Sequence, residues 1–200
     1  MFDNTLVPQW VLNEHPYDMQ DHRYVLPKML RRYLGDVSLG IEVGVAFGSM
    51  VVALLEEFPK LTMYAADPYI PYDATDGMSM DQGRMDDMYN FTNNRLQGDR
   101  VKFMRTTSAE AAKIVKDGSL DFAFIDARHQ YDSVLEDNSL WYPKIRSGGI
   151  LSGHDYCSYW PGVQKAVQER AAELNLELLV WGDVDEPPRR NTTIWAMQKP

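Results

Sequence analysis

In the segment Gly40-Ile41-Glu42-Val43-Gly44-Val45-Ala46-Phe47-Gly48-Ser49, an apolar run ends in a glycine-containing turn. Gly44 and Gly48 let the backbone turn sharply and approach a ligand that a side chain would block. A helix-like stretch, Met50–Phe58, follows the turn. Strand, turn and helix in this order are typical of an open α/β sheet, in which ligands bind beyond the carboxyl ends of the strands. A binding site is therefore expected at this turn.

The turn excludes two common kinds of nucleotide site. It lacks the third glycine of a dinucleotide-binding G-x-G-x-x-G pattern and the lysine of a triphosphate-binding loop. Glu42, beside the turn, is a poor neighbour for a pyrophosphate but suits an ammonium group. The next strand ends at Asp67, which can accept two hydrogen bonds from a ribose diol. These residues predict a ligand with an amino-acid end and a ribose, and S-adenosylmethionine (SAM) is such a ligand.

Short apolar runs alternate with helix-like segments along the chain. The runs cover 39–45, 61–66, 101–104, 120–125 and 149–151, and the helices between them cover 50–58, 80–96, 108–115 and 131–145. This alternation predicts a parallel sheet with helices on both faces. A helix over 163–174 and two final strands, 176–180 and 192–197, follow, and the loop between those strands contains Pro187, Pro188, Arg189 and Arg190. An antiparallel hairpin is expected to complete the sheet.

The composition predicts one soluble domain. The chain has 200 residues, 44% of them hydrophobic and 24% charged, with a net charge of -9. The acidic balance argues against nucleic-acid binding, and no apolar run is long enough to span a membrane. A single cysteine, Cys157, and an N-terminus without the basic segment of a signal peptide favour a cytoplasmic location.

Much of the negative charge lies in one segment. Residues 67–90 contain six aspartates and one arginine, which gives -5, together with four methionines. A charge run of this kind is usually a solvated surface. The alternative is a flexible, Met-lined lid over a site.

With these motifs the chain resembles the class I SAM-dependent methyltransferases, over about residues 36–200. The resemblance implies a three-layer Rossmann-like α/β fold with a seven-stranded, mostly parallel sheet. It places Glu42, Gly44, Gly48 and Asp67 on the cofactor motifs, and it makes Ser108 a contact of the adenine. A second interpretation is that Ser108 caps the helix that follows, and the two roles are compatible.

The fourth and fifth strands are each followed by polar residues, among them Asp126, His129, His154 and Asp155. Segments 124–131, 148–156 and 162–167 resemble the macrocin-type O-methyltransferases, which act on small molecules in sugar and polyketide tailoring. The resemblance implies that Asp126, His154 and Asp155 hold a divalent metal. Magnesium prefers oxygen ligands, whereas imidazole suits zinc, iron or nickel, so the identity of the metal, magnesium or another, stays open. The competing interpretation is that Asp155 accepts a hydrogen bond from His154 and orients it, and that no metal binds.

These residues predict a SAM-dependent O-methyltransferase for a small hydroxylated metabolite. His129 is the expected base, since its ordinary pKa is near neutral, and the alternative is a helix cap. Asp126 is expected to serve both catalysis and cofactor binding. N-methylation and a non-catalytic SAM-binding module remain the competing functions.

The whole chain, residues 1–200, is expected to form one SAM-dependent methyltransferase domain. Within it, residues 1–35 form an N-terminal helical or lid segment, and residues 67–96 an acidic, Met-rich insertion. The acceptor pocket would come from these segments, the terminal hairpin loop or a partner subunit, and the apolar, aromatic N-terminal segment is compatible with a homo-oligomer.

Overall fold

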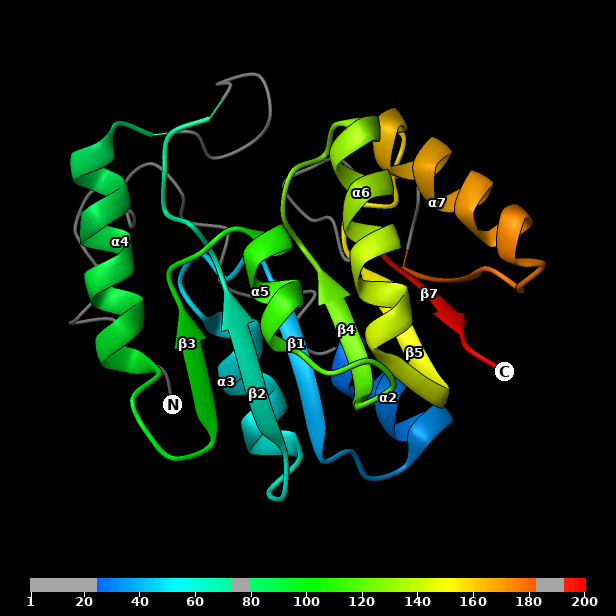
Figure 1. Ribbon diagram of the computed structural model, residues 1–200, viewed down its shortest axis with the longest axis horizontal. Coiled ribbons are helices and arrows are strands. Elements are labelled where there is room, and N and C mark those ends of the chain that lie inside the picture. Colours follow the sequence, from blue (N-terminus) through cyan, green and yellow to red (C-terminus); the bar gives the residue numbers. More distant parts are fainter. Residues whose placement is uncertain (1–24, 73–79, 183–192) are drawn as a thin grey trace.

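The computed structural model describes residues 25–72, 80–182 and 193–200 (Figure 1). Helices and strands alternate over most of this length. In chain order they are α2 (Val25–Leu34), β1 (Leu39–Val43), α3 (Ser49–Glu57), β2 (Thr62–Ala66), α4 (Gln82–Arg95), β3 (Val101–Met104), α5 (Ser108–Ile114), β4 (Leu120–Ile125), α6 (Tyr131–Trp141), a 3-10 turn (Tyr142–Lys144), β5 (Ile145–Gly153), α7 (Pro161–Leu174), β6 (Leu179–Trp181) and β7 (Ile194–Gln198).

The strands form a single seven-stranded sheet in the order β3-β2-β1-β4-β5-β7-β6. Strands β1 to β5 pair in parallel, and β7 runs antiparallel to both β5 and β6. The predicted fold class, a mostly parallel α/β sheet with a C-terminal antiparallel pair, is confirmed. In Figure 1 the arrowheads of β2, β3 and β4 reach the same edge of the sheet, where the turns after the strands gather.

The region between β4 and β5 differs in detail from the prediction. The helix predicted over 131–145 ends at Trp141, and the following 3-10 turn contains Pro143, which has no amide to continue a helix. Strand β5 begins at Ile145 rather than at residue 149. Gly148 has a φ of 74°, and the pairing with β4 shifts register near this point. This irregularity interrupts the apolar pattern of the strand, so the sequence did not reveal its first half.

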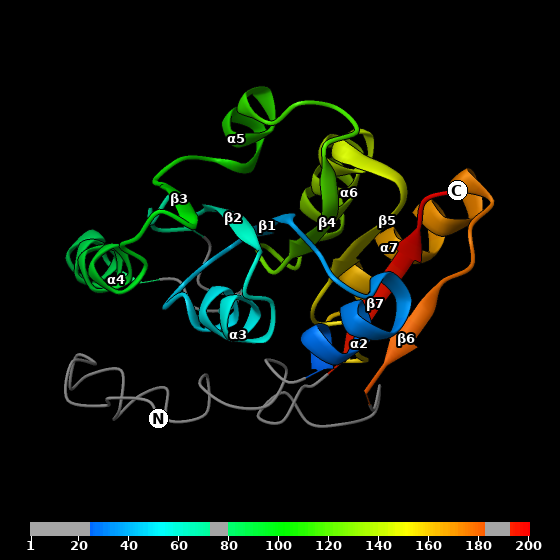
Figure 2. The same cartoon turned by 90° about the horizontal axis from the view of Figure 1, so that it is seen from below.

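Two layers of helices cover the sheet. Figure 2 separates them, with α2, α3 and α4 on one side and α5 and α6 on the other. On the first side, Leu26, Met29 and Leu30 of α2 are fully buried against α3 and the sheet. On the second side, residues of α5, α6 and α7 form a continuous apolar core with Trp141 and Trp195. Residues 25–34 of the predicted N-terminal helical or lid segment, 1–35, therefore belong to the core, and its residues 1–24 lie outside the described residues.

The three methionines of the acidic segment that the structure describes are part of the protein interior. Met80, Met85 and Met88 form a buried cluster with Phe47 and Tyr69 of the turns after β1 and β2. Asp81 caps α4 by accepting a hydrogen bond from the amide of Arg84. The described part of the segment is thus an ordered helix packed on the glycine turn, while residues 73–79 and the loop 183–192 lie outside the described residues. Among the described helices, none is long and apolar enough to cross a membrane.

Candidate functional site

The glycine turn joins three strands at one point. The Gly44 amide donates to the Ala66 carbonyl at the end of β2, and the Asp126 amide donates to the Val43 carbonyl of β1. Gly44 has a φ of 83°, and a Cβ atom there would lie 2.0 Å from the carbonyl oxygen of Asp126. Glycine is therefore required at this position by both conformation and space. The contact also places the turn directly beside the residues after β4.

Glu42 is a buried carboxylate with unused hydrogen-bonding capacity. Its side chain is 2% exposed, and Oε2 has no hydrogen-bond partner among the described residues. Burial, followed by the nearby charges of Asp126 and Asp67, raises the pKa of Glu42 well above its usual value. An unpaired buried acid beside other acids is unfavourable by itself and becomes favourable when a cation binds. This is the property expected of a site for the ammonium group of SAM.

Asp67 has a structural role that its sequence pattern did not show. Its Oδ2 accepts hydrogen bonds from the amides of Val45 and Ala46, at 2.9 and 3.1 Å, and its Oδ1 accepts one from the amide of Tyr69, at 2.9 Å. Burial raises the pKa of Asp67, and these three amides oppose the shift. Since each carboxylate oxygen has two acceptor positions, Oδ1 retains one for a ribose hydroxyl.

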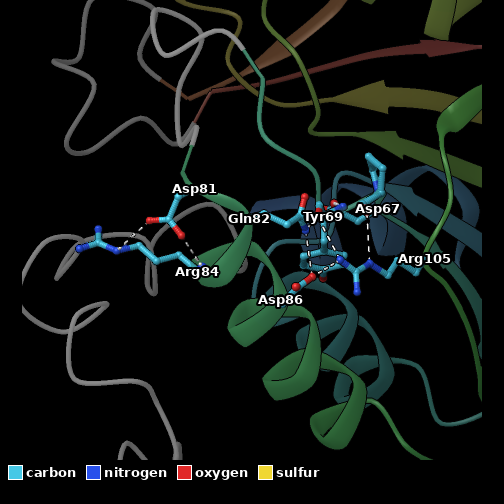
Figure 3. Close-up of polar contacts among 8 residues, drawn as sticks. Asp67, Tyr69, Asp81, Gln82, Arg84, Asp86 and Arg105 are labelled. Carbon is cyan, nitrogen blue, oxygen red and sulfur yellow. Dashed lines mark hydrogen bonds and ion pairs between the residues drawn. The ribbon is translucent and has the colours of Figure 1, made fainter.

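Arg105 ties the turn after β2 to helix α4 (Figure 3). Its guanidinium group donates to the Tyr69 carbonyl at 3.3 Å and forms an ion pair with Asp86. Gln82 donates to both the Tyr69 carbonyl and Asp86, at 3.0 and 2.9 Å. In Figure 3 these side chains converge on Tyr69, while Asp81 and Arg84 lie apart at the start of the helix. The acidic segment is therefore attached to the expected cofactor site.

Ser108 lies at the first residue of α5, and Thr107 rather than Ser108 caps this helix by accepting from the amide of Glu110. The Ser108 hydroxyl donates to Asp137 and accepts a hydrogen bond from the indole of Trp141 at 2.9 Å. The hydroxyl therefore joins α5 to α6. Its contact with adenine stays a prediction.

The buried carboxyl group of Asp137 provides a test of pH dependence. Burial raises its pKa to about 6, against a partial offset from the Ser108 hydroxyl. The folded state therefore binds the proton more tightly than the unfolded chain, and stability is lost as the pH rises through 6. We expect Asp137→Asn to raise the melting temperature at pH 7.5, by the equivalent of about 2 kcal/mol, with the gain disappearing near pH 4.

Thermal denaturation of both proteins between pH 4 and 8 measures this difference. Asp132→Asn is the matched control, because Asp132 is exposed on the same helix. A stability gain for Asp137→Asn that is the same at every pH would contradict the assignment.

Four polar side chains meet after β4 and β5. Asp126, His154 and Asp155 each place one possible ligand atom within 4.8 Å of the others. His154 Nδ1 is 3.4 Å from Asp126 Oδ1 and 3.3 Å from Asp155 Oδ2. His129 Nε2 makes a closer contact, 2.7 Å, with the same oxygen of Asp155. The structure thus brings together all four of the residues predicted at this edge.

The carboxylates and imidazoles of this cluster stabilise each other's charged forms. Burial opposes ionisation of His154, but the carboxylates of Asp155 and Asp126 outweigh it and raise the pKa of His154 well above its usual value. Burial likewise opposes ionisation of Asp155, while His154 and His129 hold the pKa of Asp155 well below its usual value. Asp155 has a left-handed backbone with a φ of 61°, a strained conformation of the kind that gathers at functional sites.

His129 is held from both sides, and it does not cap a helix. Gln130 is the capping residue of α6, whereas the His129 ring stacks on Trp160 with 4.0 Å between the ring centres. A Cβ atom on Gly162 would lie 2.7 Å from the His129 carbonyl oxygen, so a glycine lets α7 approach this turn. The contact between Trp160 and His129 was not predicted from the sequence.

Solved structures with a similar fold cover most of the chain. A putative caffeoyl-CoA O-methyltransferase from Staphylococcus aureus has a TM-score of 0.68 and 12% identity, over 96% of this chain and 90% of that one. The SAH-bound methyltransferase PaMTH1 from Podospora anserina has a TM-score of 0.62 and 15% identity, over 96% and 85%. Precorrin-6y C5,15-methyltransferase from Geobacter metallireducens has a TM-score of 0.63 and 13% identity, over 89% and 87%. At these identities the similarity shows the fold.

The family whose model matches this chain, together with the fold, defines the class, the SAM-dependent methyltransferases. Residues 41–156, more than half of the chain, match a family described as a methyltransferase domain, and the chain belongs to that family. Uncharacterized protein R132 of Acanthamoeba polyphaga mimivirus is 39% identical over 57 residues, which are 28% of this chain and 26% of that protein. The match thus spans about a quarter of that relative.

Proposed function

We propose that the protein transfers the methyl group of SAM to a hydroxyl of a small metabolite, as the resemblance to macrocin-type enzymes implies. The observation that carries the proposal is the contact between Gly44 and the backbone of Asp126. It joins the turn expected to bind the cofactor to the one cluster of described residues that combines two carboxylates with two imidazoles. The structural relative from Staphylococcus aureus, named as an O-methyltransferase, supports the choice of acceptor atom.

In this proposal, Glu42 receives the ammonium group of SAM and Asp67 receives one ribose hydroxyl. The methyl group moves in line from the sulfonium to the acceptor oxygen, which requires close approach and loss of the hydroxyl proton. His129 is the proposed base. With its proton on Nε2 donated to Asp155, the imidazole accepts the hydroxyl proton at Nδ1, and the resulting positive charge is stabilised by the Asp155 carboxylate.

Replacement of His129 by alanine is expected to lower turnover by about 100-fold or more, the usual contribution of general base catalysis. The affinity for SAM should remain unchanged, because His129 lies outside the glycine turn. Turnover is followed by formation of S-adenosylhomocysteine, and affinity by calorimetry. Gln130→Ala, the adjacent exposed residue, is the control and should behave as the wild type. Equal turnover for His129→Ala and wild type would eliminate the base assignment.

Asp126, His154 and Asp155 are also suited to hold a divalent metal. Their ligand atoms lie within 4.8 Å of one another, and a set of two carboxylates and one imidazole suits zinc, manganese or iron better than magnesium. A metal bound there would supply Lewis acidity that lowers the pKa of the acceptor hydroxyl. His129 would then remove a proton that the acceptor hydroxyl holds less tightly.

Metal titration of the protein alone tests this ligand set. We expect Zn²⁺ and Mn²⁺ to bind more tightly than Mg²⁺, and Asp126→Asn to weaken Zn²⁺ binding by at least about tenfold. Calorimetry at constant pH provides the measurement. Cys157→Ser is the control, because a thiolate is a strong zinc ligand and Cys157 follows Asp155 by two residues, and this variant should bind as the wild type does. Zinc binding that survives in Asp126→Asn, or that disappears in Cys157→Ser, would contradict the proposed ligands.

The acceptor is best identified by reaction. Tyr159 is 59% exposed and packs edge-on against Trp160, so an aromatic surface adjoins His129. Such a surface favours a sugar ring or an aryl group as the acceptor. A screen of hydroxylated sugars, polyketides and phenols for consumption of SAM, followed by mass spectrometry of the product, is the experiment. A product methylated on nitrogen or carbon would overturn the proposed O-methylation.

A further inference from the structure

Ala46, in the middle of the glycine turn, has a left-handed backbone with a φ of 44°. Residues with a Cβ atom adopt this conformation at a cost, so it persists only where the surrounding contacts maintain it. Gly44 and Gly48, its neighbours in the turn, have no such restriction. The contacts around Ala46 therefore decide whether the turn keeps its shape.

Two hydroxyl groups from distant parts of the chain donate to the carbonyl oxygen of Ala46. Tyr69 Oη and Thr92 Oγ1 each lie 2.6 Å from it. Together they use both acceptor positions of the oxygen. Tyr69 is 1% exposed and Thr92 is fully buried, so water has little access to replace either donor. A threonine within a helix commonly bonds to a carbonyl of its own preceding turn, whereas Thr92 of α4 reaches across to another element.

A second set of bonds closes the arrangement. The Ala46 amide donates to Asp67, and Asp67 also accepts from the amide of Tyr69, whose own φ is 49°. Ala46, Asp67 and Tyr69 thus support one another in a ring, with two left-handed residues in it. Since the carbonyl and amide of one peptide point in opposite directions, fixing the Ala46 carbonyl also fixes the direction of the Phe47 amide.

We propose that Tyr69 and Thr92 are positioning residues for the cofactor: their hydroxyls hold the glycine turn in the conformation that binds SAM. The inference rests on the proposed function and adds residues that no cofactor motif of the sequence contains. Without the hydroxyls, Ala46 can relax to an unstrained conformation, and SAM must restore the turn when it binds. The apparent Kd then rises as the fraction of binding-competent protein falls.

The test uses Tyr69→Phe, Thr92→Val and the double variant, titrated with SAM by calorimetry. Each single variant leaves one donor on the carbonyl and is expected to weaken binding about fivefold, as for one neutral hydrogen bond. The double variant leaves a buried carbonyl without a donor, and we expect a loss of more than about 50-fold, greater than the product of the single effects.

Two controls separate positioning from general loss of stability. Thr92→Ser keeps a hydroxyl and should bind SAM like the wild type, even if it melts at a lower temperature. Tyr89→Phe removes a hydroxyl from a ring that packs edge-on against Tyr69, and it too should bind normally. A double variant with the wild-type Kd would overturn the inference, whatever its melting temperature. Failure of the folded wild-type protein to bind SAM would instead overturn the proposed function, and this inference with it.

Discussion

The Gly44→Ala variant is expected to lose SAM binding and most of its stability. A Cβ atom at this position would lie 2.0 Å from the carbonyl oxygen of Asp126 and 2.8 Å from the Cα atom of Ala127. Both are backbone atoms, so β1 and β4 would have to separate to relieve the clash. The positive φ of Gly44 adds its own cost. We expect the free energy of unfolding to fall by more than about 4 kcal/mol, a loss that single substitutions cause only through defects such as steric overlap or backbone strain.

Gly118→Ala is the matched control for this prediction. Gly118 also has a positive φ, 65°, but a Cβ atom there would meet nothing within 4 Å. It should show only the conformational cost, about 1–2 kcal/mol, and bind SAM normally. Gly48→Ala provides an intermediate case, because its Cβ would meet the flexible side chain of Leu96 at 3.1 Å. Denaturant titration and calorimetry with SAM measure both effects, and equal losses in Gly44→Ala and Gly118→Ala would contradict the steric argument.

The Glu42→Gln variant is expected to become more stable while it loses affinity for SAM. Burial and the charges of Asp126 and Asp67 raise the pKa of Glu42, so its ionised form destabilises the folded protein when no SAM is bound. The neutral side-chain amide of the variant avoids this destabilisation, but it cannot form an ion pair with an ammonium group. We expect a rise in melting temperature of about 3 °C at pH 8, and a loss of SAM affinity of about 10-fold to 100-fold, as for a hydrogen bond to a charged group.

The pH dependence of this effect follows from the direction of the shift. Because the folded-state pKa of Glu42 is raised, stability is present at low pH and is lost as the pH rises through that pKa. The advantage of Glu42→Gln should therefore shrink on acidification.

Asp121→Asn is the opposite control for Glu42→Gln. Asp121 is also buried, but amides of Ser38 and Leu39 and the Arg146 side chain outweigh burial and lower its pKa. Its replacement should destabilise the protein. A Glu42→Gln protein that is less stable than the wild type at pH 8, or that binds SAM equally well, would contradict the assigned role.

Much of the fold follows from local patterns in the sequence. The four-residue strand 101–104 and the strand over 120–125 have the predicted bounds because apolar runs end at polar or glycine residues on both sides. The first half of β5 was missed because Gly148 and Gly149 interrupt its apolar pattern while the backbone continues as a strand. The order of the strands, with β7 between β5 and β6, depends on pairing between distant segments.

The site was predictable where its residues lie at the ends of strands or in the turns that follow them. Asp126, His154 and Asp155 gather because the carboxyl ends of neighbouring parallel strands share an edge. By contrast, Thr92 lies within a helix, 46 residues from the carbonyl that it contacts, and no local pattern distinguishes it from a surface threonine. The hydrogen bonds that Asp67 accepts within the protein could not be predicted for a similar reason. Their donors are backbone amides, which every residue except proline has, so no sequence pattern marks them.

Calorimetric titration of SAM into the folded wild-type protein, with Gly44→Ala as the paired variant, tests the cofactor assignment most directly. We predict saturable binding of one SAM per chain to the wild type, weakened in Glu42→Gln and absent in Gly44→Ala. The absence of any binding to the folded wild-type protein, with and without added Zn²⁺ or Mn²⁺, would contradict the cofactor site and the methyl transfer proposed from it.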